Sequence, residues 1–142
     1  MNKQINILLV DDEEPVRESL HLLLKNADYL ISGCGSGEEA LQLLANEQFD
    51  IIVTDLFLPD ITGIDILTKA KRFSPSIEVI LITGHASAET AVRAMKEGAF
   101  DYITKPLNIE ELRVIITKAI EKQRILSENV YLKKQLRDKY EF

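Results

Sequence analysis

Five short apolar runs alternate along this chain with five segments of helical periodicity, and this alternation constrains the fold more than any other feature. The apolar runs lie at 5–10, 29–33, 51–54, 78–83 and 102–104. Runs this short, bounded by turn-forming or charged residues, are typical of buried parallel strands. Strands that alternate with helices predict an α/β fold, in which a doubly wound sheet of five parallel strands carries helices on both faces.

The segments between the strands have the spacing and the end signals of amphipathic helices. Pro15 stands near the start of the first helix, where its missing N–H costs little. Ser36 and Glu39 form a capping-box pattern, and Gly98 has the position of a C-cap. The expected helices cover 14–26, the segment from about 37, 63–74, 88–97 and the segment from 108 onward.

Residues that can take part in chemistry follow four of the predicted strands directly. Asp11 and Asp12 follow the first strand, Asp55 the third, Thr83 ends the fourth, and Lys105 follows the fifth. In an open parallel sheet, sites form outside the carboxyl ends of the strands. The sequence therefore brings three carboxylates, a hydroxyl and an ammonium group together. Each of these acids alone is more typical of a simple turn cap, and it is the combination that indicates a site.

This set of side chains suits a divalent cation and an anionic oxygen group. Carboxylate oxygens are the ligands that Mg²⁺ prefers. The acids have no His or Cys nearby, which argues against zinc. Without a cation the carboxylates repel one another, so at least one pKa should rise. Asp55 could act as a nucleophile on phosphorus and form an aspartyl phosphate. Lys105 would supply positive charge and Thr83 a hydrogen-bond donor.

Composition excludes several other classes of protein. No apolar run is long enough to span a bilayer, and the first apolar run stops at two acids, unlike a signal peptide. We therefore expect a cytoplasmic protein. The net charge of −6 is concentrated before residue 110, so direct nucleic-acid binding is not expected. Cys34 is the only cysteine, which rules out an internal disulfide and favours a core position for it.

The last segment is longer than a small domain requires. No Gly or Pro occurs between 108 and 142, and Asn108 with Glu111 resembles a capping box. Its first half can pack on the sheet, which predicts a domain over 1–122 and a linker helix over 123–142. In the linker, 4-3-4 spacing predicts a short coiled-coil seam, with a frayed, solvated helix as the alternative. The seam residues are Ile125, Asn129, Leu132 and Leu136, with Tyr140 one turn further.

With these residues in place, the chain resembles the receiver domain of bacterial two-component response regulators. The matching segments are 8–12, 55–63, 82–84 and 101–106, within a resemblance that covers about 4–122. The resemblance implies a flavodoxin-like fold with strand order 2-1-3-4-5. It also implies a regulator rather than an enzyme, with Mg²⁺-dependent self-phosphorylation and self-dephosphorylation.

The same resemblance assigns roles to individual residues. It implies that Asp55 accepts a phosphoryl group from the phosphohistidine of a histidine kinase. It further implies that Asp12, Asp55 and the Phe57 carbonyl hold Mg²⁺, and that Asp11 reaches the ion through water. Thr83 and Tyr102 would form the switch pair, and Lys105–Pro106 a cis peptide bond. His85, two residues past Thr83, is expected at the rim of the pocket as an ordinary loop residue.

A narrower resemblance is to the receivers and linkers of NtrC-type activators of sigma-54 RNA polymerase. It rests on 83–85, 94–102 and 132–137. It implies a homodimer through the face of the fourth helix, the fifth strand and the last helix, together with the tail. In that family an AAA+ ATPase and a DNA-binding domain follow, and neither occurs in these 142 residues.

Three questions stay open at this stage. Phosphorylation could assemble a dimer or break an inhibitory one, because both schemes use the same residues. The chain could also be a stand-alone receiver or dimerisation module. A Mg²⁺-dependent phosphohydrolase of the haloacid-dehalogenase type would need a second Asp two residues after Asp55, where Phe57 stands.

Overall fold

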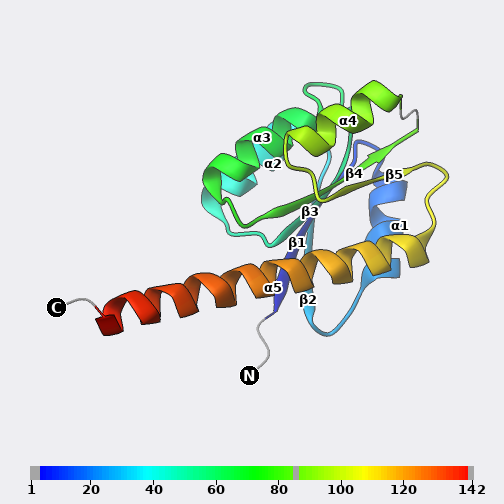
Figure 1. Cartoon of the computed structure of the whole chain (residues 1–142). Coiled ribbons are helices and arrows are strands. Elements are labelled where there is room, and N and C mark those ends of the chain that lie inside the picture. The colour runs from blue at the N-terminus through cyan, green and yellow to red at the C-terminus, as the bar shows by residue number, and fades with distance from the viewer. Residues whose placement is uncertain (1–3, 85–86, 141–142) are drawn as a thin grey trace.

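The five strands form one parallel sheet in the order β2-β1-β3-β4-β5, which confirms the predicted topology (Figure 1). The computed structural model describes residues 4–84 and 87–140, without the side chains of 126–131, 133–134 and 138–140. The strands are β1 (Ile5–Val10), β2 (Tyr29–Cys34), β3 (Ile51–Asp55), β4 (Glu78–Thr83) and β5 (Asp101–Thr104). The helices are α1 (Glu14–Leu24), α2 (Gly37–Asn46), α3 (Gly63–Phe73), α4 (Ala88–Lys96) and α5 (Ile109–Tyr140).

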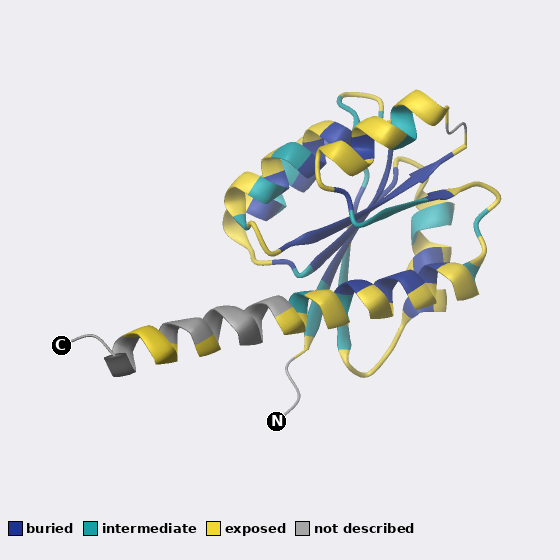
Figure 2. Cartoon of the chain, in the orientation of Figure 1, coloured by how far each residue is buried: buried dark blue, intermediate teal, exposed yellow. Residues whose placement is uncertain are grey.

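Helices cover both faces of the sheet (Figures 1 and 2). Alternate strand residues contribute to two hydrophobic cores, one on each face. Leu8, Ile52 and Leu81 pack with α2, α3 and α4 on one face. Their chain neighbours Leu9 and Val53 pack with α1 and α5 on the other. Because successive side chains of a strand point to opposite faces, strands buried on both sides must be apolar throughout.

The ends of the helices follow the predicted signals with small shifts. Ser36 Oγ accepts from Glu39 N at 3.2 Å, and Gly98 has φ of 102° after α4. Helix α1 ends at Leu24, two residues earlier than expected. At the predicted Ser36–Glu39 capping box, only the hydrogen bond that Ser36 Oγ accepts is present. A complete capping box, with both reciprocal bonds, forms instead between Thr62 and Asp65 at the start of α3.

Cys34 occupies the core position predicted for it. Its side chain is buried at the end of β2 and packs with the residues between the sheet and α2. Burial raises the pKa of the Cys34 thiol to about 11. At neutral pH the residue is therefore a protonated thiol inside the core and not a nucleophile.

Helix α5 has 32 residues and extends well beyond the sheet (Figure 1). Its first half is buried against β3 and β4 through Leu112, Ile116 and Ala119. In the second half, the side chains of Ile125, Leu132 and Leu136 are more than half exposed, while those of Asn129 and Tyr140 lie outside the described residues. Among the helices that the structure describes, none is long and apolar enough to cross a membrane.

A polar anchor holds α5 at the end of the sheet opposite the strand carboxyl ends. Glu78, only 1% exposed, pairs with Lys71 of α3 and Lys122 of α5, each at 3.4 Å. Gln123 Nε2 donates to the main-chain oxygens of Asp50 and Ser76, at 3.1 and 2.9 Å. The anchor joins helices from both faces of the sheet at the point where α5 leaves the domain.

Candidate functional site

Three carboxylates meet at the carboxyl ends of β1 and β3, as the sequence predicts. The two strands are neighbours, and Val10 pairs with Thr54, so the residues that follow each of them lie side by side. One carboxylate oxygen from each of Asp11, Asp12 and Asp55 lies within 4.8 Å of the others. Asp11 and Asp55 are buried and Asp12 is exposed, which leaves the cluster open to solvent on one side.

Asp55 lies in an electrostatically unfavourable position. Burial, followed by repulsion from Asp11, raises the pKa of Asp55 to about 6 against the opposing effect of Lys105. The expected rise of at least one carboxylate pKa is therefore confirmed. Positive charge placed beside such a carboxylate stabilises its ionised form and lowers its pKa.

Lys105 provides the nearest positive charge. Its Nζ lies 3.2 Å from Asp55 Oδ1, and its main-chain N–H donates to the Thr83 oxygen at 2.8 Å. Partial burial lowers the pKa of Lys105, but the carboxylates of Asp55, Asp11 and Glu13 outweigh it and raise the pKa overall. Lys105 is therefore an ammonium cation at neutral pH. The Lys105–Pro106 peptide bond is cis, as the resemblance implies.

The turn that carries Asp11 and Asp12 is fixed by two hydrogen bonds. Asp11 Oδ1 accepts from Glu13 N at 2.8 Å, and the Asp11 carbonyl accepts from Arg17 Nη1 at 2.6 Å. The Arg17 side chain lies over Gly33, where a Cβ would come within 3.0 Å of its Cδ. Arg17 is absent from the sequence prediction, because its contact is to a main-chain oxygen that no side-chain pattern reveals.

The segment after Asp55 turns back tightly before α3. Gly63 N donates to the Leu56 oxygen at 2.7 Å, and Phe57 forms an isolated antiparallel bridge with Thr62. A Cβ on Gly63 would lie 2.6 Å from the Asp55 oxygen, so only glycine fits this approach. Phe57 is 63% exposed and belongs to neither core.

Thr83 and Tyr102 lie on adjacent strands at different depths. Thr83 is the last residue of β4 and is buried, whereas Tyr102 pairs with Leu81, one step further from the strand ends. Tyr102 packs against the same core as Leu81, on the side of the sheet that α4 covers. Alternation along β4 puts the Thr83 side chain on this side as well. His85 lies outside the described residues.

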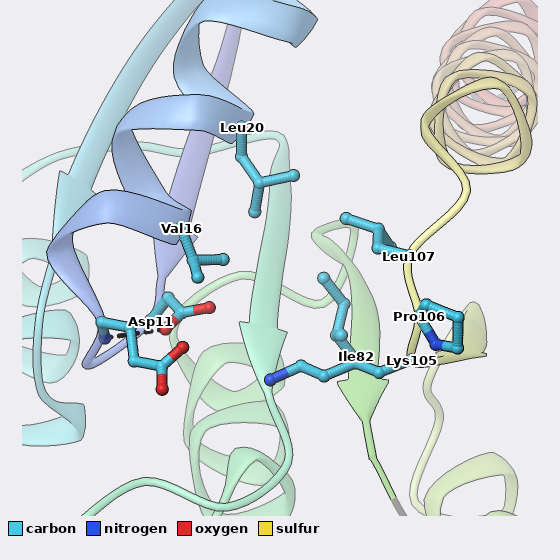
Figure 3. A pocket seen from close by; sticks show the side chains of 8 residues that line it. Asp11, Val16, Leu20, Ile82, Lys105, Pro106 and Leu107 are labelled. Atoms are coloured by element: carbon cyan, nitrogen blue, oxygen red, sulfur yellow. Dashed lines mark hydrogen bonds between the residues drawn. The ribbon is translucent and has the colours of Figure 1, made fainter.

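A cavity of about 230 Å³ opens beside the charged cluster, between α1 and the segment after β5. Figure 3 shows Lys105 extended toward Asp11, with Val16, Leu20 and Leu107 forming an apolar wall. The cavity places a solvent-accessible apolar surface next to the reactive groups.

The donor chemistry of the cluster fits a hard divalent cation. Three carboxylates face one ammonium group, which leaves an excess of negative charge that a divalent ion would balance. All three ligand atoms are oxygens, as Mg²⁺ prefers, and the exposed side at Asp12 leaves space for water ligands.

Comparison with known proteins agrees with this geometry. The family described as "Response regulator receiver domain" matches residues 7–117. An NtrX-like response regulator of Rickettsia conorii is 37% identical over 140 residues, which are 97% of this chain and 30% of that protein. The transcriptional regulatory protein ZraR of Escherichia coli is 36% identical over 116 residues, or 82% of this chain and 26% of that protein.

Two solved structures share the fold. The beryllofluoride-activated NtrC4 receiver domain dimer has a TM-score of 0.78 and 36% identity, over 83% of this chain and 98% of that chain. NtrX from Brucella abortus, in complex with ADP, has a TM-score of 0.83 and 27% identity, over 91% of this chain and 30% of that chain. The chain spans about 30% of the length of the NtrX-like relatives.

Proposed function

Because this chain belongs to the response regulator receiver domain family, we propose that it is a signalling switch controlled by phosphorylation of Asp55. One observation carries the proposal. The Asp55 carboxylate has a pKa of about 6, lies 3.2 Å from the Lys105 ammonium, and has two further acids within 4.8 Å. A reactive oxygen, a fixed cation and a cluster of oxygen ligands are the parts that phosphoryl transfer requires.

In the proposed reaction, an Asp55 carboxylate oxygen attacks the phosphorus of a phosphohistidine on a histidine kinase. An O–P bond forms, the N–P bond breaks, and the histidine nitrogen leaves with its electron pair. Lys105 pairs with a phosphoryl oxygen, and the Thr83 hydroxyl donates to another. Asp12, Asp55 and the Phe57 carbonyl would hold Mg²⁺ directly and Asp11 through water, and the ion would offset the negative charge of the transferring group. In this reaction the chain modifies itself and does not convert a separate substrate in repeated turnovers.

The signal would leave the site through the switch pair. Movement of Thr83 toward the phosphoryl group vacates space on the α4 side of the sheet, into which Tyr102 turns. These shifts alter the face formed by α4, β5 and α5, where Val92 and Met95 are large exposed apolar residues. The beryllofluoride-activated state of the NtrC4 receiver is a dimer. We propose the same consequence here, a homodimer through this face that α5 extends.

The proposed domain boundary lies near residue 122, next to the last described contact of α5 with the sheet at Gln123. Residues 123–142 would then act as a linker. Relatives such as ZraR are transcriptional regulators much longer than this chain. In that context the switch would control a downstream sigma-54-activating ATPase of the AAA+ class and a DNA-binding domain. A kinase that uses ATP as its phosphate source implies a cytoplasmic location.

Labelling with a small phosphodonor tests the proposal. The chain is incubated with acetyl phosphate, with and without Mg²⁺, and its intact mass is measured. We expect a gain of one phosphoryl group that depends on Mg²⁺ and disappears in Asp55→Asn. Asp65→Asn, at an exposed helix-capping acid in α3, serves as the matched control and should be labelled like the wild type. Full labelling of Asp55→Asn would remove Asp55 from the site.

A further inference from the structure

The segment between Asp55 and α3 is fastened to a helix that does not belong to the proposed site. The Asp60 carboxylate accepts hydrogen bonds from Gly37 N at 3.0 Å and Glu38 N at 2.8 Å, at the start of α2. It also accepts from Ile61 N at 3.0 Å. Asp60 and Gly37 are 23 residues apart in the chain, so the contact joins two segments that the sheet alone would leave separate.

Asp60 completes the hydrogen bonding of the α2 N-terminus. The first N–H groups of a helix have no partner within it, and a negative charge is favourable beside them. Ser36 Oγ accepts the N–H of Glu39, which leaves those of Gly37 and Glu38 for the Asp60 carboxylate. These hydrogen bonds, that of Glu38 first, hold the pKa of Asp60 below its ordinary value although the side chain is open to solvent.

Packing reinforces the contact. A Cβ on Gly37 would lie 2.1 Å from Ile61 Cγ1 and 2.6 Å from its Cδ1. Ile61 therefore occupies the space that a side chain at position 37 would need. We use the term α2 clasp for this contact, formed by Asp60 and Ile61 on one side and the main chain of Gly37 and Glu38 on the other.

We propose that the α2 clasp positions the Phe57 carbonyl for Mg²⁺, with Asp60 as the positioning residue. This inference rests on the proposed function. The main chain of this segment is tied at its base by the Gly63–Leu56 hydrogen bond and the Phe57–Thr62 bridge. Between these ties, Leu58 packs against the core, and the clasp attaches Asp60 and Ile61 to α2, a helix packed on the sheet. The clasp therefore fixes the part of the turn that follows Leu58.

The clasp also has a reciprocal consequence. If a fixed turn improves metal binding, metal binding must stabilise the clasp by the same free energy. Saturating Mg²⁺ should therefore slow amide hydrogen exchange at Gly37 and Glu38, although neither residue touches the acidic cluster in the proposal. This effect reports on the chain itself and needs no phosphotransfer activity.

The test compares the Mg²⁺ dissociation constant of four chains by NMR titration of the 142-residue protein. The chains are the wild type, Asp60→Ala, Gly37→Ala and the control Ser36→Ala. Asp60→Ala removes the carboxylate. Gly37→Ala keeps the carboxylate, but its Cβ would displace Ile61 and crowd Asp60 Oδ1 at 3.2 Å. Ser36→Ala removes the other cap of the same helix and leaves the clasp intact. We expect a rise of up to about tenfold in the dissociation constant for the first two variants, because the clasp acts on the Phe57 carbonyl through the main chain and tenfold is the lower end for loss of a direct outer-shell partner.

Ser36→Ala separates positioning from general weakening of α2. It should lower the melting temperature as Asp60→Ala does, yet bind Mg²⁺ like the wild type. An equal loss of Mg²⁺ affinity in Ser36→Ala, or wild-type affinity in Asp60→Ala, would overturn the role of the clasp while the proposed site stands. If Asp55→Asn binds Mg²⁺ as tightly as the wild type does, the proposed metal site is wrong. The clasp proposal then falls with it.

Discussion

At the scale of single residues, the site concentrates unfavourable charge in a buried carboxylate. The pKa of Asp55 is about 6 instead of the ordinary 3.8, chiefly because of burial and of the neighbouring Asp11. The folded state therefore binds the Asp55 proton more tightly than the unfolded state does. The contribution of Asp55 to stability is fully present below about pH 4, where the residue is protonated in both states, and is lost as pH rises through 6.

The first prediction concerns stability and pH. Asp55→Asn should raise the free energy of unfolding at pH 7.5 by about 1–3 kcal/mol, because the amide stays neutral where the carboxylate is ionised. At pH 4.5 the gain should shrink, since Asp55 is then mostly protonated in the folded protein. Urea denaturation without Mg²⁺ at both pH values measures the difference. An equal gain at both values would contradict the assigned pKa.

Lys105 gives the second prediction. Its side chain is 40% exposed, so Lys105→Ala should leave the fold intact. Asp55 should still be labelled by acetyl phosphate, but the change of assembly that follows should weaken, because no ammonium group then holds the phosphoryl oxygens. Molar mass with beryllofluoride measures this effect, and Lys118→Ala, at an exposed position in α5, is the control. An unchanged response would remove Lys105 from the switch.

At the scale of elements, the anchor around Glu78 is the least expected feature. The Glu78 carboxylate is 1% exposed, and the two cations that pair with it come from α3 and α5.

The third prediction is that Lys71→Ala lowers the free energy of unfolding by about 1–3 kcal/mol. This loss is smaller than for a buried pair with a single cation, because Lys122 remains beside Glu78. Lys69→Ala, at an exposed position of the same helix, should change stability little when both are measured by urea denaturation. Equal effects of the two variants would mean that the anchor contributes nothing.

The elements themselves could be predicted because each depends on local signals. Apolar runs define the strands, and Ser36, Asn108 and Gly98 mark helix ends in the structure as in the sequence. The contacts of Glu78 and Asp60 could not be predicted. The Glu78–Lys122 pair joins residues 44 apart, and Asp60 reaches an N–H 23 residues away. In the sequence alone, these charged side chains are typical of a solvated surface.

At the scale of the whole molecule, the first half of α5 belongs to the face that it forms with α4 and β5, and its second half is the proposed linker. Lys122 both pairs with Glu78 and lies 5.6 Å from the centre of the Phe100 ring, next to β5. Beyond Gln123, the described apolar side chains of the predicted seam are exposed and available to a second copy. The order of the strands and the acidic cluster could be predicted from sequence, but the direction in which α5 leaves the sheet depends on this anchor.

The fourth prediction separates the domain from its linker. A chain that ends at residue 123 should unfold with nearly the same free energy as the full chain, within about 1 kcal/mol, because the described residues beyond 123 do not belong to either core. Its tendency to form dimers should fall. Urea denaturation and sedimentation velocity measure the two effects. A large loss of stability would show that the linker is part of the domain.

The most direct test of the central claim is molar mass by light scattering, with Mg²⁺ and beryllofluoride, for the wild type and Asp55→Asn. Beryllofluoride stands in for the phosphoryl group on Asp55. We expect the wild type to shift from one copy toward two when both additives are present, while Asp55→Asn keeps its mass. A wild type that binds beryllofluoride and keeps the same mass, or a dimer that the additive dissociates, would contradict activation by assembly.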